Sequence, residues 1–211
     1  MPPVTLALLI SNGLLFLLQM VYGDALIISF GLWPLGNAAL ELQGGMSVPE
    51  FAPWQLITYG FLHGSIGHLF FNMLALWMFG AALEQAWGSN RYAVFVLTGI
   101  IGAGVAQLIF AAVTHEPYPT VGASGGVYAV LLGFGMMFPN RMVLLLIPPI
   151  PMKAKYLVLI FGAMELFFGI TGTQQGVAHF AHLGGMVTGY FLILKWRRDY
   201  ERRIEAQRGF D

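Results

Sequence analysis

Five long stretches of this sequence contain no charged side chain, and this feature limits the folds open to the chain more than any other. Asp, Glu, Lys and Arg are absent from residues 1–23, 51–83, 92–115, 117–140 and 166–194. Each stretch is long enough to hold a helix that crosses a hydrocarbon layer of about 30 Å. The sequence therefore predicts an all-α polytopic membrane protein, with the lipid bilayer as its immediate partner.

The composition supports this prediction and excludes several functions. Charged residues make up only 9% of the chain, against about 25% in an average soluble domain. Ten basic and ten acidic residues cancel, so no net field recruits nucleic acid. The chain has no cysteine, which excludes disulfides, thiolate metal sites and a cysteine nucleophile. Ser, Thr, His and carboxylate side chains remain for chemistry, and we expect no cofactor.

Glycines, prolines and polar clusters divide the apolar stretches into six predicted helices within a single membrane domain, residues 1–211. The predicted helices are about 4–23, 66–87, 92–113, 124–138, 154–171 and 177–196. A loop over 24–65 and a basic tail over 197–211 complete the domain. The first helix lacks a basic leader and an Ala-x-Ala cleavage site, so we expect it to be retained.

All ten basic residues fall on one side of this six-helix arrangement. They are Arg91 after the second helix, Arg141, Lys153 and Lys155 after the fourth, and Lys195, Arg197, Arg198, Arg202, Arg203 and Arg208 after the sixth. The loops at about 24–65, 114–123 and 172–176 contain no Lys or Arg. The positive-inside rule then places both termini in the cytoplasm, and a bacterial inner membrane is the expected location.

The fourth predicted helix is too short to cross the membrane. It follows the irregular segment 117–123 and ends before Pro139, which leaves a length of about 22 Å at 1.5 Å per residue. If Arg141 holds its inner end at the cytoplasmic surface, Ser124 at its outer end lies below the headgroups. Irregular backbone at that depth requires surrounding protein or water, so the sequence predicts a wet pocket beside Ser124.

Ser124 begins this helix, where unpaired backbone N–H groups and the positive end of the helix dipole converge. That position suits an oxygen nucleophile whose attack creates an oxyanion. An N-terminal serine is also a common helix cap without any chemical role. The short pattern Gly122-Ala123-Ser124-Gly125 leaves both interpretations open, and a base within reach of Ser124 would favour the first.

The sixth predicted helix supplies a candidate base. His182, Gly185 and Gly189 share one helical face, and small residues at such spacing let two membrane helices approach closely. Gly125 offers a matching small residue on the fourth helix. His179 is expected on another side of the sixth helix, nearer the outer surface, so His182 is the predicted base and a His179→Ala variant is expected to keep most activity.

The second predicted helix adds His68 and Asn72, which are four residues apart and can both donate hydrogen bonds into the interior. His63 lies one turn further out, in the preceding loop. A zinc site made from His63, His68, His179 and His182 is the alternative, but we expect no carboxylate to join them, and no metal is predicted. Glu165 is expected to be protonated or paired within the bundle, outside the catalytic set.

Together these motifs resemble the rhomboid family of intramembrane serine proteases, over about residues 54–190. The resemblance rests on three motifs in family order. They are His63-x4-His68-x3-Asn72, Gly122-Ala-Ser124-Gly125 with Tyr128, and Ala181-His182-x2-Gly185-x3-Gly189. Glu84 matches the acidic residue that ends the second helix in many members. Where members often have Trp-Arg in the first outer loop, this chain has Trp54-Gln55. The predicted helices correspond to the minimal six-helix bacterial form of the family.

The resemblance implies a fold, an activity and a role for each motif residue. The fold is a six-helix rhomboid-like bundle with a short central fourth helix. Ser124 would be the nucleophile and His182 the general base of a dyad without an acid. His68, Asn72 and the Ser124 N–H would form the oxyanion hole, His63 would be structural, and Tyr128 would pack on the His182 ring. The glycines at 122, 125, 185 and 189 would support this arrangement.

The sequence thus predicts a serine endopeptidase that cuts transmembrane protein substrates in or near their membrane segments. A non-catalytic membrane chaperone on the same scaffold is the alternative, although inactive relatives lack the serine or the histidine. A solute transporter is disfavoured because the two halves of the chain show no matching repeats.

Overall fold

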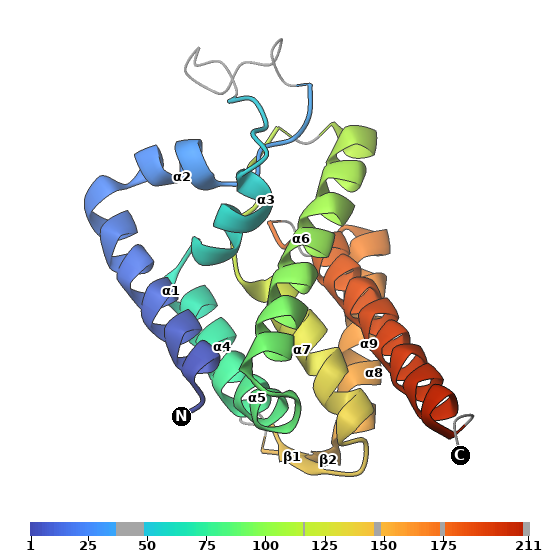
Figure 1. The fold of residues 1–211 in the computed structure, drawn as a ribbon. Coiled ribbons are helices and arrows are strands. Elements are labelled where there is room, and N and C mark those ends of the chain that lie inside the picture. Colours follow the sequence, from blue (N-terminus) through green and yellow to red (C-terminus); the bar gives the residue numbers. More distant parts are fainter. Residues whose placement is uncertain (37–48, 116, 146–148, 174–175, 209–211) are drawn as a thin grey trace.

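A computed structural model describes residues 1–36, 49–115, 117–145, 149–173 and 176–208, and these form a bundle of helices (Figure 1). The helices are α1 (Pro3–Tyr22), α2 (Asp24–Phe30), α3 (Gln55–Thr58), α4 (Ile66–Ala75), α5 (Ala81–Trp87), α6 (Ser89–Thr114), α7 (Ser124–Met137), α8 (Ala154–Thr171) and α9 (His179–Arg208). A 3₁₀ turn over Tyr59–Phe61 follows α3, and a π-helical segment over Leu76–Gly80 joins α4 to α5.

Four helices of the described part of the chain are long and apolar enough to cross a membrane. They are Pro3–Tyr22, Ile66–Trp87, Ser89–Thr114 and Ala154–Thr171. These four agree with predicted helices one, two, three and five. The fourth predicted helix corresponds to α7, which is apolar but has only 14 residues. The count of six membrane spans therefore stays a prediction.

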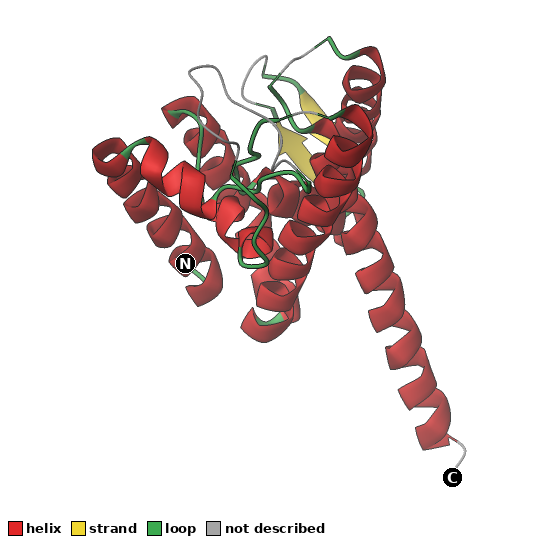
Figure 2. Cartoon of the chain, turned by 90° about the horizontal axis from the view of Figure 1, so that it is seen from above, coloured by secondary structure: helices red, strands yellow, loops and turns green. Residues whose placement is uncertain are grey.

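Three features of the fold differ from those predicted from the sequence. The loop predicted over 24–65 contains α2 and α3, while Glu41 within it, like Glu116, lies outside the described residues. Strands β1 (Met142–Leu144) and β2 (Pro151–Lys153) pair antiparallel between α7 and α8. α9 continues about 12 residues beyond the predicted end at 196, because Lys, Arg and Glu are good helix formers. Figure 2 shows this extension projecting from the bundle.

α1 packs with its polar face inward, because lipid is the solvent on its outer side. Thr5, Asn12 and Gln19 recur every seven residues and are buried, whereas Leu14 and Leu17 are exposed. The Glu84 carboxylate accepts hydrogen bonds from the backbone N–H groups at the start of α1 and from the Thr5 hydroxyl. These contacts fix the N-terminal end of α1 against α5.

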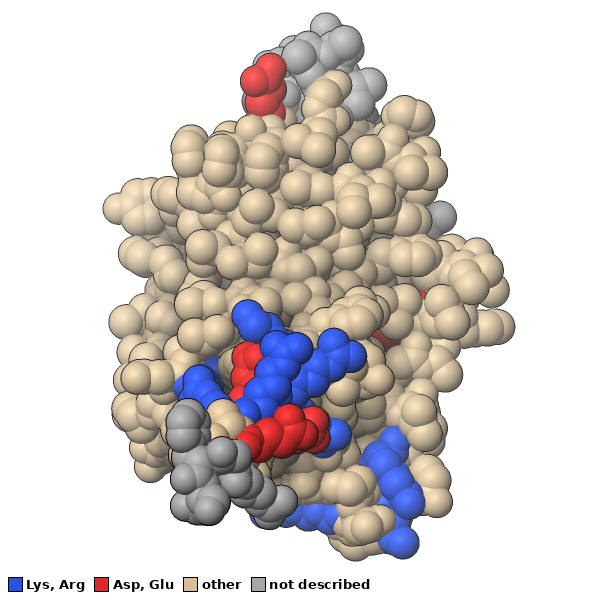
Figure 3. Space-filling model, turned by 45° about the vertical axis from the view of Figure 1, so that its right-hand side comes forward, with Lys and Arg blue, Asp and Glu red and all other residues tan. Residues whose placement is uncertain are grey.

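The turn between α5 and α6, the β1–β2 hairpin, the start of α1 and the C-terminal part of α9 lie at one end of the molecule (Figure 1). Every described Lys and Arg belongs to these elements or to the residues beside them. Figure 3 shows basic side chains gathered at that end on the visible face. α2 and α3 lie toward the opposite end (Figure 1).

Candidate active site

A cavity of about 940 Å³ lies among the helices of the bundle. Its lining comes from the start of α4, the C-terminal part of α6, the segment before α7, the end of α8 and the start of α9. Ser124, His182, His68, Asn72 and Tyr128 all line it. The structure therefore brings five of the residues singled out from the sequence to one space, which is the expected pocket beside Ser124.

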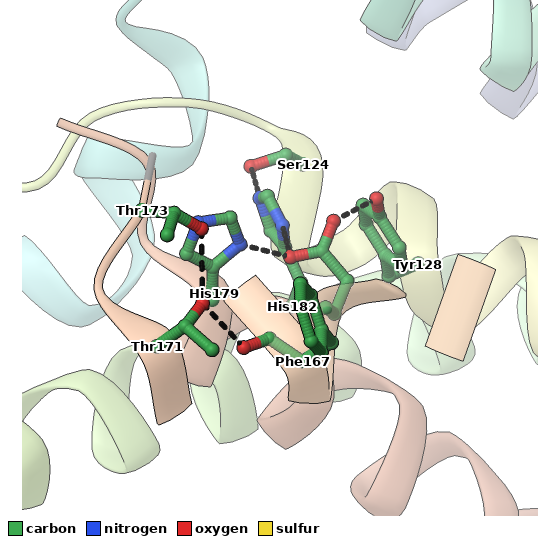
Figure 4. Close-up of polar contacts among 8 residues, drawn as sticks. Ser124, Tyr128, Phe167, Thr171, Thr173, His179 and His182 are labelled. Carbon is green, nitrogen blue, oxygen red and sulfur yellow. Dashed lines mark hydrogen bonds and ion pairs between the residues drawn. The ribbon is translucent and has the colours of Figure 1, made fainter. Parts of the chain in front are cut away.

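Ser124 and His182 are in direct contact in this cavity (Figure 4). The Ser124 Oγ and the His182 Nε2 are 2.8 Å apart, within hydrogen-bond distance. Ser124 is the first residue of α7 and is half-buried, and His182 lies in the first turn of α9 and is buried. Nε2 can accept the hydroxyl proton in this geometry, provided that the ring carries its own proton on Nδ1.

Small residues allow α7 and α9 to approach closely enough for this contact. A Cβ atom at Gly185 would overlap the Gly125 carbonyl oxygen and would lie 2.9 Å from its carbonyl carbon. One full turn later a Cβ at Gly189 would lie 3.3 Å from the Ala129 Cβ. The Cβ position of Gly125 itself points at Ala103 of α6. Gly125 therefore allows close contact with two helices. α6 packs where a Gly125 side chain would be, and α9 packs against the Gly125 backbone.

His68 and Asn72 lie one helical turn apart on α4 and face the same cavity as Ser124. The Asn72 side chain is buried, and its Nδ2 has no hydrogen-bond partner within the described residues. Gly122 has a φ of 132°, and a Cβ there would lie 2.7 Å from the His68 Nε2 and 3.5 Å from the Ser124 Oγ. Gly122 thus lets the His68 ring lie beside the serine. An unpaired buried donor at such a place is available to a ligand.

His63 lies behind this cluster and not in the cavity lining. Its backbone N–H donates to the Gln19 side-chain oxygen and its carbonyl accepts from the Gln19 amide, which ties this loop to α1. Its ring packs edge-on against the His68 ring, with centroids 5.0 Å apart. Burial, with a smaller effect from His68, lowers the pKa of His63 to about 4. At neutral pH this ring is therefore uncharged, as suits a packing role.

Tyr128 packs on the His182 ring. The two rings are stacked, with centroids 4.3 Å apart and planes 10° from parallel. The Tyr128 hydroxyl donates a hydrogen bond to the Oε1 of Glu165. Tyr128 therefore restrains the ring of the candidate base and also contacts a carboxylate that lies beside the base.

The positions of Glu165 and His179 correct two sequence-based expectations. His179 is buried, and its Nδ1 lies 2.6 Å from the Glu165 Oε2, so it does not face outward away from His182. The same oxygen lies 2.9 Å from the His182 Nδ1. A carboxylate therefore does join the histidine cluster. Sequence reasoning missed this because Glu165 is on α8, and spacing within one helix says nothing about a side chain on another.

Glu165, His179 and His182 also present three atoms of metal-ligand type within 4.8 Å of one another. Ligands 2.0–2.1 Å from a tetrahedral zinc ion would lie about 3.4 Å apart. The separations of 2.6 and 2.9 Å from the carboxylate oxygen to the two imidazole nitrogens are shorter than this. The geometry of the cluster fits hydrogen bonds and an ion pair better than it fits a shared ion.

Gln55 anchors the chain segment that leads into α3. Its buried side-chain oxygen accepts hydrogen bonds from the backbone N–H groups of Trp33 and Ala52. The Trp54 indole donates to the carbonyl of Ser29. These contacts hold the segment after α2 against the segment before α3, and the Gln55 side-chain amide joins the two.

The fold and its apolar helices define an integral membrane protein of the all-α class. The sequence model of the Rhomboid domain matches residues 50–198, and the chain belongs to the rhomboid family. It is 27% identical to rhomboid protease GlpG of Yersinia pestis (strain Pestoides F) over 207 residues, which are 96% of this chain and 66% of that protein. It is 33% identical to rhomboid protease GluP of Bacillus subtilis (strain 168) over 140 residues, 65% of this chain and 25% of GluP.

Proposed function

We propose that this protein is an intramembrane serine endopeptidase that cleaves transmembrane proteins in or near their membrane segments. The observation that carries the proposal is the 2.8 Å contact between the Ser124 hydroxyl and the His182 ring, at the wall of a large cavity in an apolar helical bundle. Membership of a family whose matched relatives are named proteases supports the same conclusion.

In the proposed reaction the Ser124 Oγ attacks the carbonyl carbon of the scissile peptide bond and gives its proton to the His182 Nε2. The carbonyl oxygen becomes an oxyanion, which accepts hydrogen bonds from the Ser124 N–H, the Asn72 Nδ2 and the His68 ring. His182 then returns the proton to the leaving amine. A water molecule from the cavity hydrolyses the acyl-enzyme, with His182 again as the base.

Substrates must present an extended strand, because a helix hides its carbonyls in internal hydrogen bonds. Small or helix-breaking residues near the outer membrane boundary would lower the cost of unwinding. The cavity is lined in part by α4, α8 and the segments before α7 and α9. Transmembrane segments with such residues are therefore the proposed substrate class.

We propose six membrane spans, in which α7 and the apolar first part of α9 join the four longer helices. The described basic residues lie at the end of the bundle that also holds the start of α1 and the C-terminal part of α9, which supports a cytoplasmic location for that end. Ser124 would then lie nearer the outer face, below the headgroups. The bacterial inner membrane is the proposed location.

The direct test is a single-span reporter protein incubated in liposomes with the purified wild type and with Ser124→Ala. The wild type should produce a discrete cut near the outer boundary of the reporter span, and Ser124→Ala should produce none. Undiminished cleavage by Ser124→Ala would exclude Ser124 as the nucleophile. Stable binding of the reporter by a folded but inert wild type would favour a non-catalytic chaperone instead.

A further inference from the structure

We infer that Glu165 is a positioning residue for His182, so that Ser124, His182 and Glu165 act as a triad in which His179 and Tyr128 hold the carboxylate. The inference rests on the proposed protease function and adds a third member to the serine and histidine of that proposal. It concerns a buried carboxylate that the reaction described above does not use.

The contacts form a continuous chain from α7 through α9 to α8. The Ser124 Oγ contacts the His182 Nε2 at 2.8 Å, and the His182 Nδ1 lies 2.9 Å from the Glu165 Oε2. Figure 4 shows the Ser124 hydroxyl directed at the His182 ring, with His179 nearby. The two nitrogens of the imidazole thus face a hydroxyl on one side and a carboxylate on the other, as in a serine protease triad.

Glu165 is held in place by partners for both of its oxygens. Oε1 accepts a hydrogen bond from the Tyr128 hydroxyl, and Oε2 is 2.6 Å from the His179 Nδ1. The Glu165 side chain is only 9% exposed. A carboxylate this deep in a membrane protein is costly unless it is partnered. Partners on two other helices, α7 and α9, fix its position relative to the base.

A carboxylate at this place would set the tautomer of His182. The base can accept the serine proton only if Nε2 is unprotonated, so the ring proton must reside on Nδ1. The Glu165 Oε2 favours a proton on Nδ1 and stabilises the imidazolium that forms during attack. The contact has the distance of an ion pair, but its angle in this structure falls short of a hydrogen bond. A rotation of the ring or of the carboxylate would be needed to complete it.

His179 contacts the Glu165 carboxylate directly and also lines the cavity. Its Nδ1 makes the shorter of the two imidazole contacts to Oε2, and its Nε2 has no partner within the described residues. His179 and His182 are three residues apart, so both rings reach the same carboxylate from one face of α9. His179 and His182 therefore share the Glu165 Oε2, and the His179 contact keeps the carboxylate turned toward α9.

The test compares Glu165→Gln with the wild type and with a matched control, Glu84→Gln. Glu84 is also a buried carboxylate in the bundle, but its partners are Val4, Thr5 and Ser89, away from the cavity. The measurements are kcat and KM for the single-span reporter, the labelling rate of Ser124 by a fluorophosphonate, and thermal stability. Rates are referred to the amount of folded protein.

Glu165→Gln should lower kcat about 100-fold or more, with KM within about threefold of the wild-type value, because an amide can favour the wrong tautomer. The labelling rate should fall in parallel. Glu165→Asp keeps a carboxylate and should recover at least about tenfold of the lost kcat. Glu84→Gln should lower thermal stability while kcat per folded protein stays at the wild-type value.

Three results would overturn the inference. The first is a kcat for folded Glu165→Gln within about threefold of wild type. The second is an equal loss for Glu165→Asp and Glu165→Gln, which would show that the carboxylate matters only for packing. The third is loss of wild-type activity in EDTA with recovery on adding Zn²⁺ alone, which would make the cluster a metal site. A folded wild type without cleavage or labelling would instead refute the protease proposal itself.

Discussion

Gly185→Ala tests whether the close approach of α7 and α9 is what brings His182 to Ser124. A Cβ at residue 185 would overlap the Gly125 carbonyl oxygen and lie 2.9 Å from its carbonyl carbon, where ordinary contact begins at 3.4 Å. The backbone fixes both the Cβ position of residue 185 and the Gly125 atoms that it meets, so no side-chain rotation relieves the overlap. The helices must separate by about 1 Å, at a cost of about 3 kcal/mol in the free energy of unfolding.

A displacement of this size should reduce activity as well as stability. Misplacing reactive groups by about 1 Å can cost about 100-fold in rate, and the Ser124 and His182 atoms now 2.8 Å apart would lose their hydrogen bond. We therefore expect kcat for Gly185→Ala to fall about 100-fold, with fluorophosphonate labelling slowed in parallel. The assays are reporter cleavage and probe labelling in detergent, at a temperature where the variant is folded.

The matched control is Gly162→Ala on α8, which also faces α9. A Cβ there would meet only the flexible end of Met186, with its nearest atom at 3.3 Å. This variant should change both kcat and the unfolding free energy little. If Gly185→Ala keeps wild-type kcat while folded, or if Gly162→Ala is equally damaged, the close contact at Gly185 does not position the dyad.

Three further predictions concern other parts of the molecule. Asn72→Ala should lower kcat about 10- to 1000-fold while the reporter KM changes little, because an oxyanion donor acts only in the transition state; a raised KM at unchanged kcat would assign Asn72 to binding. Glu84→Gln should lower the unfolding free energy by about 2 kcal/mol, measured by thermal or denaturant unfolding, since it weakens bonds to the start of α1. In intact cells a cysteine at Glu50 should react with an impermeant maleimide and one at Arg202 should not; the reverse pattern would contradict the proposed orientation.

The sequence alone was enough to bring together the main polar residues of the cavity. Ser124 could be selected because its helix is too short to span the bilayer, and His182 because Gly185 and Gly189 mark the face that packs closely. Both inferences use the length of one helix or the residue spacing within it. The α-helix has a regular rise and a regular period, so both can be worked out from sequence. The structure places the two side chains in contact, at 2.8 Å.

Contacts between helices could not be predicted in the same way. Glu165 was visible as an acid in an apolar stretch, but its pairing with the two histidines depends on how α8 is rotated against α9. The burial of Thr5, Asn12 and Gln19 does follow a seven-residue spacing that the sequence displays. That spacing indicates an inward polar face only once the outer side of α1 is known to face lipid.

The end of α9 was misplaced for a different reason. The predicted end at 196 follows the change from apolar to charged residues, which marks the edge of the hydrocarbon layer. Helical structure does not need to stop there, because Asp199 and Arg203, four apart, can pair along an exposed helix in water. Hydropathy limits the membrane-embedded part of a helix, and helix propensity decides where the helix itself ends.

The most direct test of the central claim is to locate the covalent adduct of a fluorophosphonate on the purified protein by peptide mass spectrometry. The activated hydroxyl of a serine protease should react selectively, so the adduct should lie on Ser124 and should be missing from both Ser124→Ala and His182→Ala. Labelling of another residue, or labelling of Ser124→Ala at the wild-type rate, would contradict the assignment of Ser124 and His182 as nucleophile and base.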